Sequence, residues 1–62
     1  MHLQYLISGR NLSGRVNLGR DTPEAALKKA REFLQEGYLD VRISTPRGLA
    51  LSPDEFYQLD FG

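Results

Sequence analysis

The sequence predicts an α+β fold: a four-stranded antiparallel sheet in the order 2-1-3-4, with one main helix packed on one face and a short C-terminal helical turn. Two observations predict it. Residues 22–38 repeat apolar side chains at spacings of three and four, which is the period of an amphipathic helix. On either side of that segment, apolar and polar residues alternate over short runs, as in strands with one buried face.

The length and composition of the chain limit the classes of protein to which it can belong. With 62 residues, we expect a single domain, 1–62, near the size at which folding buries only about 60% of the unfolded surface. With no cysteine and one histidine, neither disulfides nor a structural zinc site is expected. The N-terminus lacks a signal-peptide pattern, and no apolar run approaches the ~20 residues of a membrane span. We therefore expect a cytoplasmic protein without a membrane partner.

Charge is distributed unevenly along a chain whose net charge is zero. Residues 1–31 hold six basic and two acidic side chains, whereas residues 32–62 hold two basic and six acidic ones. Such polarity suits an acidic partner or head-to-tail pairing with a second copy. A solvated surface whose two ends differ is the favoured interpretation.

The first two strands are predicted to form a hairpin. Leu3, Tyr5 and Ile7 alternate with polar residues and predict the first strand. Residues 8–14 are rich in glycine, serine and asparagine and are expected to reverse the chain. Residues 14–19 alternate again and predict a second strand, antiparallel to the first.

The predicted helix has clear signals at both ends. Thr22 can cap the first turn, and Pro23 suits the first helical position. Gly37 can adopt a left-handed conformation after the last turn, and Tyr38 is then expected to fold back onto Phe33.

A third strand follows, with Leu39, Val41 and Ile43 on its buried face. Residues 45–48, Thr-Pro-Arg-Gly, predict a tight turn. Strand two, helix and strand three then make a crossover, so strand three pairs with strand one and every neighbour is antiparallel.

The end of the chain predicts a short fourth strand and a helical turn. Leu49 and Leu51 are expected on the buried face of that strand. Residues 52–55, Ser-Pro-Asp-Glu, form a capping box. The helical turn behind it is expected to contain Phe56, Tyr57 and Leu59.

Packing of the helix on the sheet defines a core and an open face. Phe33 and Leu34 are expected to be buried beside Tyr5, Val16 and Val41. The opposite face is predicted to stay solvated, as antiparallel sheets allow, and to form a possible interaction surface. The residues predicted on that surface are Gln4, Leu6, Arg15, Asn17 and Arg42.

The sequence indicates no catalytic site and no cofactor. Nucleophilic catalysis needs a base beside the nucleophile, and the only histidine, His2, stands near the N-terminus. The acidic pairs Glu32/Glu36 and Asp54/Glu55 are typical of helix caps and solvated surface. We therefore expect that the protein is not an enzyme.

Glycine-arginine dipeptides at 9–10, 14–15 and 19–20 suggest nucleic-acid binding. If residues 15–20 are extended, Arg15 and Arg20 lie about 17 Å apart on opposite faces, so they cannot share a phosphate. Turn formation explains the glycines. Tyr5 is expected in the core and offers no stacking surface to a base. Nucleic acid is therefore compatible with the sequence but not favoured.

The segment RDTPEAALKKAREFLQEGYLDVRI, with SPDEF after a short turn, resembles a pattern in small uncharacterised bacterial proteins of β-β-α-β-β type. More loosely, residues 1–43 resemble the β-β-α-β domain of HicB-like antitoxins, in which a hairpin leads to a helix opening with Asp-Thr. The second resemblance implies an antitoxin or nucleic-acid-binding role. No functional residue carries over from it.

The favoured function is a small cytoplasmic protein-interaction module with an unknown protein partner. The alternative is a HicB-like antitoxin or a nucleic-acid-binding accessory domain, and an enzyme ranks third. We expect a monomer or a weak homodimer. The second strand, as an exposed sheet edge, is the expected contact of a dimer, although arginines on it could repel one another across a two-fold axis.

Overall fold

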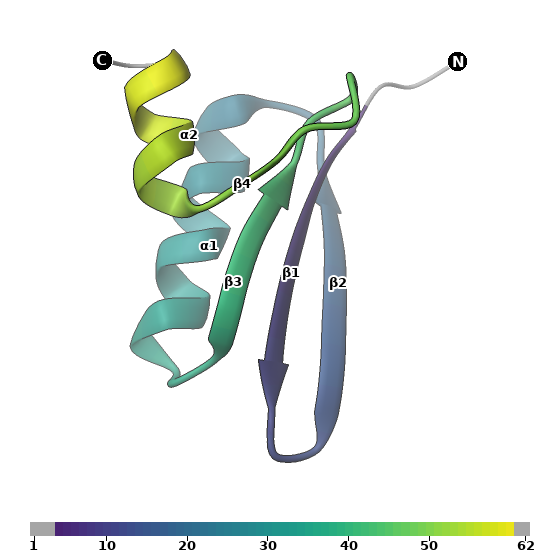
Figure 1. Ribbon diagram of the computed structural model, residues 1–62, viewed down its shortest axis with the longest axis vertical. Helices are drawn as coiled ribbons and strands as arrows, with labels where there is room; N and C mark the ends of the chain where they lie inside the picture. The colour runs from purple at the N-terminus through teal and green to yellow at the C-terminus, as the bar shows by residue number, and fades with distance from the viewer. Residues whose placement is uncertain (1–3, 61–62) are drawn as a thin grey trace.

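The computed structural model describes residues 4–60 and contains one sheet and two helices, so His2 and Leu3 lie outside the described residues. The sheet order is β2-β1-β3-β4, and every neighbouring pair is antiparallel. Both the predicted α+β class and the predicted strand order are confirmed (Figure 1). The elements are β1 (Tyr5–Asn11), β2 (Gly14–Arg20), α1 (Pro23–Gln35), β3 (Leu39–Ser44), β4 (Ala50–Leu51) and α2 (Pro53–Asp60). Within residues 4–60, neither helix has the length and apolar content needed to cross a membrane.

Helix α1 begins and ends where its sequence predicts. The Thr22 hydroxyl accepts a hydrogen bond of 3.2 Å from the Ala25 amide. At the other end Gly37 has a φ of 87°, and the Tyr38 amide donates to the Phe33 carbonyl at 3.0 Å. The Phe33 and Tyr38 rings stack with their centroids 4.6 Å apart, which confirms the predicted contact.

The core lies between the sheet and the two helices. Phe33 is buried, as predicted, but Leu34 is 51% exposed, so that part of the prediction is wrong. In Figure 1, α2 runs beside the N-terminal half of α1 and leaves the last turn, which carries Leu34, uncovered on that side. The buried core residues are Ile7, Ala26, Leu27, Ala30, Phe33, Val41, Ile43 and Phe56.

Strand β1 is longer than the sequence predicts. It continues to Asn11, and only Leu12 and Ser13 connect it to β2, so the predicted reversal over residues 8–14 is wrong. Gly9 is buried within β1. A Cβ atom at this position would lie only 3.0 Å from both the Phe33 and the Tyr38 ring, so the two rings can pack on the strand because residue 9 is glycine. Its role is close packing, whereas Gly14, with a φ of 127°, serves the turn.

Replacing Gly9 with alanine is expected to destabilise the fold by about 1–3 kcal/mol, because the added methyl group must displace two stacked rings. Gly19→Ala is the matched control, since a Cβ there meets only the flexible end of the Gln4 side chain. It should be neutral or slightly stabilising. Urea denaturation measures both, and equal stability of the two variants would show that the rings do not rest on Gly9.

A β-bulge changes the direction of the side chains at the start of β3. The pairing register with β1 shifts between Ser8 and Arg10, so β3 carries one extra residue, and Asp40 has a φ of 52°. Leu39 is therefore paired with Arg10 on the open face and is 60% exposed. The prediction that Leu39 is buried is wrong for this reason, while those for Val41 and Ile43 are confirmed.

The predicted turn at residues 45–48 is confirmed, with a φ of 94° at Gly48. Leu49 closes this turn through its carbonyl, which accepts from the Thr45 amide at 2.7 Å. It precedes β4 and is 53% exposed, so its predicted burial is wrong. Leu51, in β4, packs against the core in a partly buried position.

Helix α2 is a full element of the fold. Its capping box is formed in both directions: the Ser52 amide donates to Glu55 Oε1 at 3.0 Å, and the Glu55 amide donates to Ser52 Oγ at 3.2 Å. Phe56 is fully buried and meets the Tyr5 ring edge-on, with centroids 5.6 Å apart. Leu59 is 66% exposed, so Phe56 is the apolar anchor of this helix.

Candidate functional site

The sheet face opposite the helices is the candidate site. The structure places all five predicted surface residues in exposed positions: Gln4, Leu6, Arg15, Asn17 and Arg42. Cross-strand pairing brings most of them into adjacent rows. In one row, Ser8 stands between Asn17 on β2 and Arg42 on β3, and in the next Arg10 stands opposite Arg15.

Two charged residues of this face were not predicted to belong to it. Arg10 belongs to the part of β1 that was expected to be a turn, because Gly9 interrupts the alternation of polar and apolar residues in the sequence. Asp40 reaches the site through the β-bulge of β3, for which the sequence has no comparable signal.

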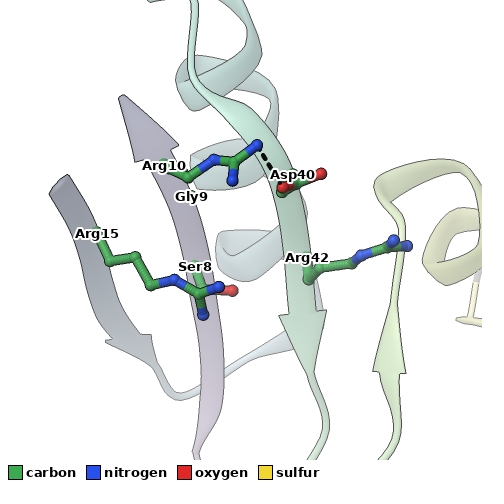
Figure 2. A pocket seen from close by; sticks show the side chains of 6 residues that line it. All are labelled: Ser8, Gly9, Arg10, Arg15, Asp40 and Arg42. Atoms are coloured by element: carbon green, nitrogen blue, oxygen red, sulfur yellow. Dashed lines mark ion pairs between the residues drawn. The ribbon is translucent and has the colours of Figure 1, made fainter. Parts of the chain in front are cut away.

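Three arginines and one aspartate surround a hollow of about 290 Å³ on this face. The Arg10 guanidinium lies 2.9 Å from the Asp40 carboxylate, and both side chains are more than half exposed. Figure 2 shows Arg10 reaching toward Asp40 and Arg42 extending from β3 toward β4. The lining residues are Ser8, Gly9, Arg10, Arg15, Asp40 and Arg42.

We define the basic cluster as Arg10, Arg15, Arg42 and Asp40. It carries more positive than negative charge. Arg10 and Arg15 are direct cross-strand partners, an arrangement in which like charges repel unless an anion lies between them. Asp40 pairs with Arg10, whereas Arg15 forms no ion pair with the side chains that the structure describes.

The positive charge of Arg42 also acts on Glu55 in the first turn of α2. The Ser52 amide, followed by the Ser52 hydroxyl, lowers the pKa of Glu55, and the positive charge of Arg42 lowers that pKa further. Glu55 is therefore ionised at neutral pH and partly compensates Arg42. Arg10 and Arg15 remain the centre of the basic cluster.

Guanidinium groups are suited to binding carboxylates or phosphates, because each presents a planar fork of N–H donors. The Ser8 hydroxyl can donate as well. Among residues 4–60, no group of three or more histidine, cysteine, aspartate or glutamate side chains is gathered to hold a metal ion. The arrangement of arginine side chains is suited to recognition of an anion.

A second hollow of about 490 Å³ lies at the β3–β4 turn and is more apolar. It contains two of the exposed leucines, Leu49 and Leu59. The other residues around it are Tyr5, Thr45, Pro46, Arg47 and Leu51.

Comparisons with protein-family models, with curated proteins and with solved structures found no match to this chain. The resemblances to small bacterial ββαββ proteins and to HicB-like antitoxins therefore stay predictions. The case for a function depends on the open face itself.

Proposed function

We propose that this protein is a small cytoplasmic, non-catalytic interaction module whose open sheet face binds an acidic segment of a protein partner. The observation that carries the proposal is the placement of Arg10, Arg15 and Arg42 on one uncovered face with Asp40 as the counter-charge within the cluster.

The spacing of the arginines supports an extended acidic segment. The Cα atoms of cross-strand partners such as Arg10 and Arg15 are about 4.5–5.5 Å apart, so their long side chains can converge on one carboxylate or separate to two. In an extended peptide, carboxylates at positions i and i+2 lie on one side about 6.7 Å apart. Two such groups can be reached by two neighbouring guanidinium groups.

The existing ion pair does not prevent such binding. Exposed pairs contribute about 0–1 kcal/mol, and the side chains of Arg10 and Asp40 are 51% and 59% exposed. A partner carboxylate can therefore replace Asp40 beside Arg10 at small cost. Asp40 also discourages random anions, which favours ligands that supply more than one negative charge.

A protein partner is favoured over a nucleic acid by the remaining residues of the face. Proteins that bind single strands usually stack bases on aromatic side chains, and the open-face residues of β1, β2 and β3 include none. The net charge of zero also provides little of the long-range attraction that phosphate backbones require.

Calorimetric titration with an extended octapeptide carrying glutamate at alternate positions tests this proposal. We expect binding that weakens with salt, and at least a tenfold weaker affinity, about 1.4 kcal/mol, for the double variant Arg10→Ala/Arg15→Ala. Lys28→Ala/Arg47→Ala is the matched control, because it removes the same charge from exposed positions elsewhere. Equal losses in both variants would contradict a specific site. Tighter binding of a single-stranded DNA octamer than of the peptide would favour the nucleic-acid alternative.

A further inference from the structure

Strand β2 forms an open edge of the sheet. Its seven residues, Gly14–Arg20, pair with β1 on one side, and the sheet order places no strand on the other. Every second residue of such a strand directs its amide and carbonyl away from the sheet. The opposite edge, β4, has only two residues and leads directly into α2. Of the two edges in the described residues, β2 is thus the one with room for another strand.

The helical layer does not fully cover this edge. Figure 1 shows α1 and α2 gathered on the side of β3 and β4, while the β1–β2 hairpin projects beyond them. Val16 and Leu18, which face the core from β2, are accordingly only partly buried. Beside its unpaired backbone groups, the edge therefore presents apolar side chains that a neighbour can cover.

We propose that β2 pairs with β2 of a second copy, antiparallel across a two-fold axis at Asn17, and joins the two four-stranded sheets into one. In this register Val16 faces Leu18 of the second copy, and Leu18 faces its Val16. Both pairs lie on the helix side and extend the two cores toward each other. An axis at Val16 would instead place Leu18 opposite glycine, and an axis at Leu18 would place Val16 opposite arginine.

The same register resolves the expected repulsion between arginines. Arg15 falls opposite Gly19 of the second copy, and Arg20 falls opposite its Gly14, so each arginine faces a residue without a side chain. The two Arg15 Cα atoms are then separated by about four residues of strand, roughly 13 Å, which exceeds the screening length of ~8 Å at physiological salt. Because the glycine-arginine dipeptides at 14–15 and 19–20 are five residues apart, the arginine of each dipeptide faces the glycine of the other dipeptide in the second copy.

Charge complementarity adds to this fit. Asp21 lies two residues beyond Gly19, and its carboxylate accepts a hydrogen bond of 3.2 Å from the Gln4 side chain in an exposed position. Arg15 of the second copy would be diagonal to it, a distance that a long side chain can span. Arg20 Nη1 donates to the Gly19 carbonyl at 2.7 Å, and that oxygen can still accept an amide from the second copy.

Sedimentation equilibrium at tens of micromolar tests the dimer directly. The wild-type protein should approach twice the monomer mass of 7.0 kDa. Gly19→Lys should weaken the dimer at least tenfold, because it places a positive charge opposite Arg15. It should leave the fold intact, since a Cβ at this position meets only the Gln4 side chain. Gly19→Glu, which faces Arg15 with a negative charge, should keep or strengthen the dimer.

A second variant tests the dimer independently, in case Gly19→Lys does not fold. Asn17 is exposed on the open face, and Asn17→Lys would place two lysines opposite each other at the axis, so it should also give a monomer. Circular dichroism verifies that each variant is folded. A wild-type protein that sediments at 7.0 kDa, or a folded Gly19→Lys or Asn17→Lys protein that remains dimeric, would overturn the proposal.

Discussion

Replacing Phe33 with alanine should lower the free energy of unfolding by about 3–5 kcal/mol. The Phe33 ring is 3% exposed, stacks on Tyr38 and lies close to Gly9, so its loss opens a cavity where helix and sheet meet. A domain of this length has a total stability of roughly 3–9 kcal/mol, at about 0.05–0.15 kcal/mol per residue. The variant should therefore be largely unfolded or close to it, and urea denaturation followed by circular dichroism measures the effect.

The adjacent residue provides the control for this result. Leu34 is 51% exposed in the last turn of α1, so Leu34→Ala should cost less than about 1 kcal/mol. A similar loss for both variants would show that the orientation of α1 is wrong.

Phe56→Ala should be the second severely destabilising change, again by about 3–5 kcal/mol. Phe56 is fully buried, makes an edge-on contact with Tyr5, and is the buried apolar residue of α2. Its removal should release α2 from the sheet as well as create a cavity. Thermal unfolding measured by near-ultraviolet and far-ultraviolet circular dichroism reports both consequences.

Leu59, in the same helix, is the matched control because it is 66% exposed. Leu59→Ala should change stability by no more than about 0.5 kcal/mol. If Phe56→Ala melts within a few degrees of wild type, α2 does not contribute to the core.

Features set by local chemistry could be predicted from the sequence. The caps of α1 and α2 depend on residues within a few positions of each other, and each cap predicted for Thr22, Gly37 and Ser52 is formed. The sheet order followed from the crossover through α1, which leaves few arrangements.

Features set by tertiary packing could not be predicted in the same way. Gly9 resembles a turn residue in sequence, and only the closeness of Phe33 and Tyr38 explains it as part of a strand. The bulge at Asp40 depends on how β3 aligns with β1 after the left-handed Gly37, and no local pattern indicates it. Leu39 is therefore exposed, although the alternation of the sequence predicts that it is buried.

The candidate site shows the same division. Alternation placed the five predicted open-face residues correctly in exposed positions, including Arg15 and Arg42. The sequence does not reveal Arg10, because Gly9 resembles a turn residue, and it does not reveal Asp40, because the bulge has no local signal. The ion pair between Arg10 and Asp40 is therefore visible only in the structure.

Binding of an acidic segment by the open face is tested most directly by mapping amide chemical shifts in an NMR titration with the alternating glutamate octapeptide. The expected result is a group of shifted amides around Ser8, Arg10, Arg15 and Arg42, with little change along the exposed side of α1. Absence of shifts, or shifts confined to α1 or to the apolar hollow around Leu49, would contradict it.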